Sequence, residues 1–290
     1  MAVTYDDTET STGLARRRPR LTVDETERRM LRAAVDLVNR SGLTVSLEHI
    51  RFEDVIHEAG VSRSAAYRRW PYKDQFFGDL LRELAKATTP AAVTQDASVQ
   101  HVRRVVLEQL DLLTSPQSRH DLVVELIRQS ATHDFLAMYS STHWRTYLAL
   151  HATFLSLTDG RLRDDVQQAL AEAERGFTGR IANAWEHLAA LLGYRLRPEL
   201  NAGFETLATL VTASARGLVI MALSTPDLAA GRVHAQPFGA AATSEWSLTA
   251  MGIAAIAFGF LEPDPAVEWD EHRIAAIRQT LGSQDWSAGL

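Results

Sequence analysis

The chain contains no cysteine among its 290 residues. This absence excludes disulfide bonds, thiolate nucleophiles and cysteine-ligated metal sites. Long apolar runs are also scarce, because the longest, residues 248–261, contains two glycines and is too short to cross a bilayer comfortably. The first ten residues hold three acids and no apolar run, so we expect no signal peptide. We therefore expect a cytoplasmic protein with no membrane partner.

Motifs of catalysis and cofactor binding are missing too. The sequence has no Gly-x-Ser-x-Gly elbow, no P-loop and no dinucleotide fingerprint. Among the 10 histidines, His143 and His151 share a helical spacing but have no close carboxylate, so no metal site is predicted. We expect no cofactor, no catalytic residue and no enzyme activity, although serine and histidine are frequent enough to leave an all-helical enzyme open as an alternative.

Positive charge is concentrated near the N-terminus. The whole chain carries a net charge of −6, yet residues 11–73 contain 13 basic and 8 acidic residues. A basic module on an acidic body is the charge distribution expected of a protein that binds DNA at one end. Residues 1–20, which end in an arginine-rich run, are predicted to be a disordered basic arm that either lies along phosphates or only aids solubility.

The most informative stretch runs from Ala59 to Lys73, with the sequence AGVSRSAAYRRWPYK. Gly60 suits a sharp left-handed turn, Ser62 suits the N-cap of a new helix, and Pro71 prevents that helix from continuing. The segment between Gly60 and Lys73 contains no acid. This layout favours a helix-turn-helix, in which the second helix enters the major groove of DNA. An ordinary helical hairpin with a solvated basic face is the alternative.

The same residues resemble the second half of the DNA-binding domain of TetR-family transcriptional regulators. The family pattern matches here at Ala59, Gly60, Val61, Ser62, Tyr67, Trp70 and Lys73, and the resemblance covers about residues 22 to 85. Two residues depart from it, since Ala66 and Trp70 stand where the family usually has Leu and Phe. We expect the larger Trp to compensate for the smaller Ala in one packed layer.

The resemblance implies roles for the residues of the short basic helix. Base edges would be read by Arg63, Ser64 and Arg68, with Ala65 against a thymine methyl, and phosphates would be held by Tyr67, Arg69 and Lys73. Arginine is a bidentate match to guanine, and tyrosine and lysine suit phosphate oxygens, so the side chains fit these roles. Arg51, at the expected start of the preceding helix, is a further candidate for a phosphate contact.

The remaining periodicity is helical, and it predicts an all-α fold. A helix-turn-helix DNA-binding domain over residues 21–88 is followed by a helical effector-binding and dimerisation domain over residues 89–290. Residues 43–51 are either an extra helical turn or a longer loop, and residues 225–243 look like an irregular loop. The apolar helices at about 200–223 and 245–261 either form a homodimer interface, as the resemblance implies, or fill a monomer core.

A small-molecule pocket is expected where aromatic and polar groups mix. The candidates are Tyr139, His143, Trp144, Tyr147, His151, Phe154, Phe177 and Trp185. An apolar pocket with a few convergent polar groups is typical of ligand sites, although a bulky core layer explains the same residues. Together with the resemblance, this predicts a dimeric, ligand-responsive repressor that binds a palindromic double-stranded operator. The alternatives are an effector-independent DNA-binding regulator, an activator, or the enzyme with a vestigial DNA-binding domain.

Overall fold

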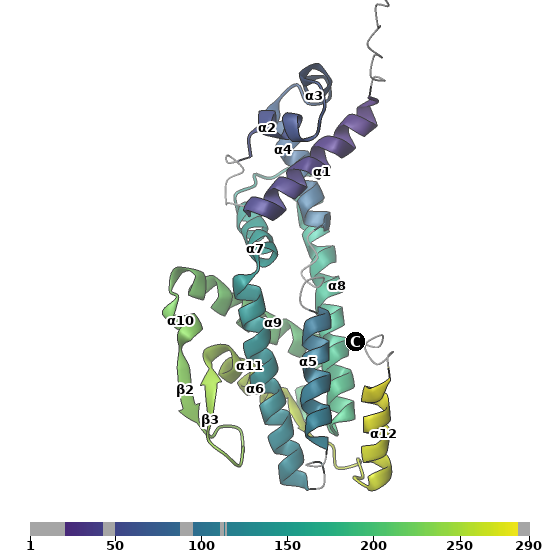
Figure 1. Cartoon of the computed structure of the whole chain (residues 1–290), viewed down its shortest axis with the longest axis vertical. Helices are drawn as coiled ribbons and strands as arrows, with labels where there is room; N and C mark the ends of the chain where they lie inside the picture. The colour runs from purple at the N-terminus through teal and green to yellow at the C-terminus, as the bar shows by residue number, and fades with distance from the viewer. Residues whose placement is uncertain (1–20, 43–49, 88–94, 111–112, 114, 284–290) are drawn as a thin grey trace, which may run out of the picture.

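The computed structural model describes residues 21–42, 50–87, 95–110, 113 and 115–283. These residues form an all-α fold with two short two-stranded ladders, as the sequence predicts for the fold class. Figure 1 shows a small group of helices, α1 to α4, at one end of an elongated molecule. We call this group (residues 21–42 and 50–87) the head, and the described residues 95–283 the body. The predicted arm at 1–20 and the predicted boundary at 88/89 lie outside the described residues.

The head is built from four helices: α1 (Val23–Ser41), α2 (Phe52–Glu58), α3 (Arg63–Arg69) and α4 (Lys73–Ala87). Thr22 caps α1 by accepting a hydrogen bond from the backbone N–H of Glu25 at 3.1 Å. The head core is aromatic at its centre, where Phe52, Trp70 and Phe76 pack with ring centroids 5.0 to 6.4 Å apart. These three rings join α2, the end of α3 and α4 into one unit.

The turn between α2 and α3 has the predicted geometry. Gly60 has a φ of 62°, a left-handed conformation that a side chain would strain. Ser62 is the N-cap of α3, and its hydroxyl accepts a hydrogen bond from the N–H of Ala65 at 3.2 Å. Helix α2 begins at Phe52, with Ile50 and Arg51 outside the helix. The alternative of an extra helical turn over residues 43–51 is therefore wrong for Ile50 and Arg51. The remaining residues of that segment, 43–49, lie outside the described residues.

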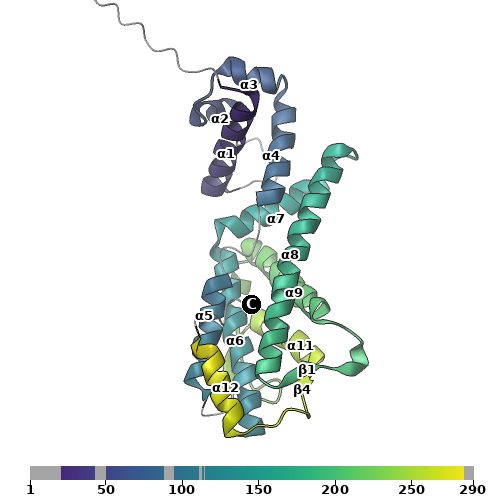
Figure 2. The same cartoon turned by 90° about the vertical axis from the view of Figure 1, so that its right-hand side faces the viewer.

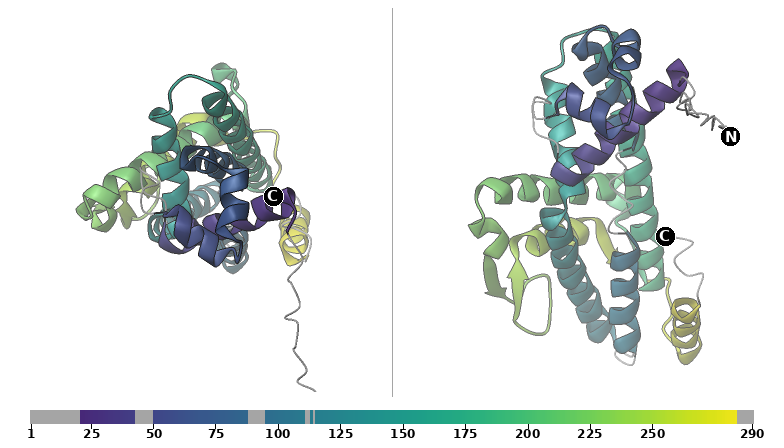
Figure 3. Two further views of the ribbon diagram at one scale, coloured as in Figure 1. Left: turned by 90° about the horizontal axis from the view of Figure 1, so that it is seen from above. Right: turned by 45° about the horizontal axis from the view of Figure 1, so that its top comes forward.

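The body is also built mainly from helices. They are α5 (Gln95–Glu108), α6 (Pro116–Ser140), α7 (Thr142–Leu155), α8 (Arg161–Leu191), α9 (Phe204–Ser224), α10 (Asp227–Ala230), α11 (Leu248–Phe260) and α12 (Glu271–Gly282). Figure 2 shows that α8 extends from the lower part of the body up to the level of α4. Figure 3 shows α12 and the β2–β3 hairpin on opposite sides of the body.

Two helices of the body also belong to the core of the head. Leu150 of α7 and Val166, Ala169 and Leu170 of α8 are buried in the same hydrophobic cluster as the head residues. Gly78 of α4 faces the side chain of Leu162 of α8, and a Cβ at this glycine would lie 3.4 Å from that side chain, at van der Waals distance. The head is therefore packed directly onto α7 and α8.

Short strands are the feature that the sequence did not predict. β1 (Tyr194–Leu196) pairs with β4 (Leu261–Pro263), and β2 (Arg232–Ala235) pairs with β3 (Ser244–Ser247), both antiparallel. The segment 225–243 is thus not wholly irregular, because it contains α10 and β2. Strands of three or four residues are too short to show a two-residue alternation, and pairing with a distant segment holds them in place.

Helix α9 is the most apolar long helix of the described residues. Its length and mean hydropathy of 1.6 would suit a membrane span, and 33% of its 18-residue apolar segment is buried inside the molecule. It packs against α8 and α11, where a Cβ on Gly252 would lie 3.3 Å from the hydroxyl of Ser214. Its exposed side includes Leu210, Ile220 and Met221, of which the last two are more than half exposed.

Candidate functional site

Helix α3 lies at the outer end of the head, away from the body (Figure 1). The side chains of Arg63, Ser64 and Arg68 are exposed on it, whereas Ala65 is half-buried and Ala66 is buried. The small Ala66 lies on the inner side of the helix, so it allows α3 to pack closely on the head core. The three residues expected to read base edges therefore share an accessible surface.

A carboxylate from the preceding helix contacts this surface. Glu53 of α2 accepts hydrogen bonds from Nε of Arg63 at 2.8 Å and from the hydroxyl of Tyr67 at 2.9 Å. The bond from Tyr67, together with the bond and charge of Arg63, holds the pKa of Glu53 below its usual value, and the same bond raises the pKa of Tyr67. Sequence reasoning missed Glu53, although its position in the first turn of α2 is visible from the motif spacing.

The residues expected to hold phosphates divide into two groups. Lys73, Tyr67 and Arg51 are exposed. Arg69 is turned toward the head instead, where its Nε donates to Glu27 at 2.7 Å and its Nη2 donates to Asp79 at 3.1 Å. Its guanidinium also lies 4.9 Å from the centre of the Trp70 ring. Because these contacts already use Arg69 inside the head, we leave it out of the proposed DNA contacts.

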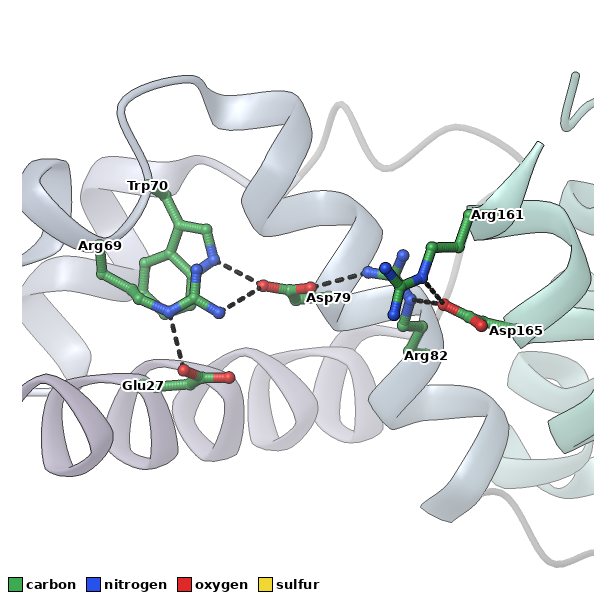
Figure 4. A network of polar contacts seen from close by, with 7 residues as sticks. All are labelled: Glu27, Arg69, Trp70, Asp79, Arg82, Arg161 and Asp165. Carbon is green, nitrogen blue, oxygen red and sulfur yellow. Dashed lines mark hydrogen bonds and ion pairs between the residues drawn. The ribbon is translucent and has the colours of Figure 1, made fainter.

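Asp79 is the centre of a polar network that runs from the head to the body (Figure 4). Its carboxylate accepts hydrogen bonds from the indole N–H of Trp70 at 2.8 Å, from Arg69, and from Arg82 at 2.8 Å. Arg82 in turn donates its Nε–H to Asp165 of α8 at 2.8 Å. The chain of contacts thus leads from the end of α3, through α4, to the first turns of α8.

The body contains an apolar cavity of about 240 Å³. Helices α6 and α8 supply most of its wall, and the remainder comes from α5, α7, α9, α11, Leu192 and the strands β1 and β4. Apolar side chains such as Leu126, Ile127 and Val211 dominate the lining, and the polar residues include Ser130, Asp134, Arg180 and Thr212. A largely apolar wall with a few polar groups is the usual form of a small-molecule site.

Three of the eight residues expected in the pocket line this cavity: Trp144, Phe177 and Trp185. The other five lie elsewhere. Tyr139 stacks on Phe135, His151 lies against Tyr147, and Phe154 packs at the core of the head, with Tyr147 and His143 also outside the lining. The spacing of His143, Tyr147 and His151 placed them on one face of α7. It did not show that, of this helix, only Trp144 lines the cavity. The missed lining residue with the clearest chemistry is Arg180, an arginine of the long helix α8.

A half-buried charge network lies next to the cavity wall. Arg216 of α9 donates to both carboxylate oxygens of Glu174 at 2.8 and 2.9 Å, and the hydroxyl of Tyr147 donates to the same carboxylate. The guanidinium also lies 5.0, 5.1 and 5.6 Å from the centres of the rings of Phe177, Tyr147 and Trp144. Burial raises the pKa of Glu174, but the bonds from Arg216 and Tyr147 outweigh it and lower that pKa overall. Burial is the main cause that raises the pKa of Tyr147.

Metal-binding geometry is missing from the part of the chain that the structure describes. No three His, Asp or Glu side chains there are grouped so that they could hold an ion. The surface on α3 and the cavity in the body are therefore the two sites that we consider for function.

Comparison with known proteins adds little to this description. No family model and no curated protein matches the chain. Among solved structures, the chain is similar to one titled "SmeT-Triclosan complex", with 18% sequence identity over 84% of this chain and 98% of that chain, and a TM-score of 0.36. The assignment of function consequently depends on the residues of this chain itself.

Proposed function

We propose that this protein is a dimeric, ligand-responsive transcriptional regulator, acting as a repressor, that reads a palindromic DNA operator with α3. The observation that carries the proposal is the accessible basic surface of α3. Arg63, Ser64 and Arg68 are exposed at the end of the molecule, immediately after the glycine turn of a helix-turn-helix. A recognition helix uses the residues of its first turns to contact base edges.

Exposed groups around α3 would position the helix on the DNA backbone. Lys73 begins α4 and Arg51 precedes α2, so both lie at helix starts that flank the reading surface. Tyr72, which the sequence prediction did not include, is 71% exposed between α3 and α4 and offers a further hydroxyl. Contacts of this kind set the register of a protein on DNA and carry no sequence information themselves.

A second copy of the chain is the proposed occupant of the exposed side of α9. Thr206, Leu210, Ala213, Gly217 and Ile220 follow one another at intervals of three or four residues, so they share one face of this helix. Helix α11, which packs on α9, contains no charged residue at all. An uncharged face of this kind is suited to a two-fold interface, and two copies are needed to read two half-sites. We therefore propose a homodimer formed through α9 and α11.

The cavity in the body is the proposed effector site, and α7 and α8 are the proposed connection to DNA. Trp144 of α7 lines the cavity while Leu150, less than two turns later, is buried in the head core. Helix α8 likewise carries Phe177 at the cavity and Leu170 in the head core. An effector that binds two arrangements of these helices unequally would shift the spacing of the two reading heads. The presence of a cavity favours this proposal over an effector-independent regulator.

Binding of the purified protein to the DNA beside its own gene tests the proposal. We expect protection of a palindromic site in a footprint, with an affinity that falls steeply as salt increases, because phosphate contacts release counterions. A scrambled duplex of the same length and base composition serves as the control. Equal binding to both duplexes, or no dependence on salt, would contradict sequence-specific DNA binding.

A further inference from the structure

Arg180 presents unpaired hydrogen-bond donors at the wall of the cavity. Its Nε and Nη2 are shut off from solvent, and neither has a hydrogen-bond partner among the described residues. Among the ion pairs of the described residues, none includes Arg180. Arg180 as a whole is half-buried, but these two donor atoms are closed to solvent, and buried polar atoms almost always have hydrogen-bond partners. A hydrogen-bond acceptor from outside the chain would satisfy these two donors of Arg180.

Two further donors without partners belong to residues of the same wall. The indole Nε1 of Trp144 and the hydroxyl of Ser130 are both buried and make no hydrogen bond within the described part of the chain. Tryptophan can only donate, and serine can donate or accept. These three side chains therefore favour a ligand that offers hydrogen-bond acceptors. The carboxylate of Asp134 also lines the cavity, but it has an interaction of its own within the protein.

Arg216 provides the contrast within the same protein. It is also half-buried, and its Nε and Nη2 likewise have no hydrogen-bond partner among the described residues, but its Nη1 pairs with Glu174 at 2.8 Å and three aromatic rings lie around it. Its charge is therefore balanced inside the structure. Arg180 forms no ion pair with a carboxylate of the described residues, although Asp134 lines the same cavity and Glu174 lies only six residues away on the same helix. Arg216 therefore has a counter-charge within the body, whereas the charge of Arg180 is left for an anionic ligand to neutralise.

The size and surface of the cavity limit the remainder of the ligand. An apolar cavity of about 150 Å³ accepts benzene, so a cavity of about 240 Å³ holds on the order of ten non-hydrogen atoms. Apart from the few polar groups, the wall is aliphatic and aromatic, and its aromatic residues include Trp144, Phe177 and Trp185. The body of the ligand should therefore be apolar.

From these observations we infer that the cavity binds a compact apolar monoanion, such as an aryl or alkyl carboxylate, whose acidic group pairs with Arg180. The inference rests on the proposed function, since it names the chemical class of the proposed effector. It concerns ligand binding by the free protein, however, and can be measured without DNA.

Tryptophan fluorescence of the full-length protein provides the test, because Trp144 and Trp185 line the cavity. The probes are 3-phenylpropanoate, the neutral alcohol 3-phenylpropan-1-ol and the cation 3-phenylpropylammonium, which share one apolar part. We expect the carboxylate to bind about 10-fold or more tightly than the alcohol, since bonds to charged groups are the stronger ones. The ammonium should not bind measurably. Equal affinity for carboxylate and alcohol, or tighter binding of the ammonium, overturns the inference.

Variants assign the preference to Arg180. Arg180→Met keeps most of the side-chain volume, and we expect it to reduce the carboxylate affinity to that of the alcohol while leaving the alcohol affinity unchanged. Arg175→Met on the exposed side of α8 is the matched control and should change neither affinity. If Arg180→Met does not fold, Arg180→Lys should keep a weaker preference for the carboxylate. A full preference in the Met variant, or none in the Lys variant, overturns the inference.

Failure of this inference and failure of the proposed function are distinguishable. A protein that protects its operator but shows no preference for the carboxylate retains the proposed function and refutes the ligand class. A protein that binds the carboxylate through Arg180 but shows no specific DNA binding supports the ligand class and refutes the regulator.

Discussion

The indole N–H of Trp70 donates a hydrogen bond to the carboxylate of Asp79 at 2.8 Å. Phenylalanine, which the resemblance places at this position, has no donor, so the substitution changes more than the volume of the side chain. Trp70 is fully buried, and its ring packs edge-on against Phe76 at 5.1 Å. Besides the expected role of the larger Trp70 ring in offsetting the smaller Ala66, Trp70 therefore links the end of α3 to α4 through this hydrogen bond.

Replacing Trp70 by Phe should destabilise the head. The change removes a hydrogen bond to a charged acceptor, which contributes about 1–3 kcal/mol to the free energy of unfolding. Trp246→Phe is the control, since Trp246 is equally buried but its indole Nε1 has no partner among the described residues. We expect urea denaturation to show the larger loss for Trp70→Phe. A larger loss for Trp246→Phe would contradict the role of the Asp79 bond.

The head shows which structural features could be predicted from the sequence and which could not. Gly60, Ser62 and Pro71 act within a few residues of chain, so their effects on the turn, the N-cap and the end of α3 were predictable. The position of Arg69 was not, because its partners Glu27 and Asp79 lie 42 and 10 residues away in the chain. Charge and spacing alone do not reveal which side chains meet across a tertiary contact.

Three basic residues on or near α3 should behave differently toward DNA. Arg63→Ala should relax base preference at one position of each half-site, by about 1–3 kcal/mol. Lys73→Ala should weaken all duplexes about equally and lower the slope of affinity against salt by about 1. Arg69→Ala should leave that slope unchanged and lower the melting temperature, because Arg69 pairs with Glu27 and Asp79.

Fluorescence anisotropy with matched and mismatched duplexes over a range of salt measures all three effects. Arg32→Ala, at an exposed arginine of α1, is a suitable control for the loss of one positive charge. The assigned roles would be refuted by equal losses of specificity for Arg63→Ala and Lys73→Ala.

Removing the charge of Glu53 should strengthen DNA binding. Glu53 lies beside Arg63 and Tyr67, so its negative charge faces the same surface that is proposed to meet phosphates. Glu53→Gln keeps an oxygen that can accept from Tyr67 while removing the charge, and we expect affinity for every duplex to rise by up to about 10-fold at low salt. Glu58→Gln, at the other end of α2 and paired with Arg40, should have a smaller effect. A fall in affinity for Glu53→Gln would mean that Glu53 is needed to orient Arg63.

A charge on the exposed side of α9 should separate the two copies. Ile220 is 54% exposed there, and burial of a carboxylate without a partner in an apolar interface is costly. We expect Ile220→Glu to sediment as a monomer and to lose operator binding. Leu155→Glu, at the end of α7 and 79% exposed, should remain dimeric. A dimeric Ile220→Glu variant would place the interface elsewhere.

The cavity was harder to predict than the head. Trp144, Phe177 and Trp185 were among the candidates because aromatic residues are frequent in pockets, yet the cavity is formed mainly by aliphatic side chains of α6 and α8. Such residues are identical in type to ordinary core residues, so only their arrangement in space distinguishes them. Arg180 illustrates the same point, since its missing partner is visible only when every neighbour is known.

The Glu174–Arg216 pair should make the stability of the body depend on pH. The folded-state pKa of Glu174 is lowered, so its contribution is present above the ordinary value of 4.5 and is lost as pH falls through the lowered folded value. At pH 7, Glu174→Gln leaves Arg216 without its counter-charge. We expect a loss of about 1–3 kcal/mol, less than the roughly 3–5 kcal/mol for a fully buried pair, because Glu174 is partly exposed. Glu172→Gln, on the same helix and exposed, is the control.

Urea denaturation at pH 7 should separate the Glu174→Gln variant from the unmodified protein, and the two curves should converge as pH falls below 4.5. A difference that stays constant or grows toward low pH would show that Glu174 acts through packing rather than through its charge.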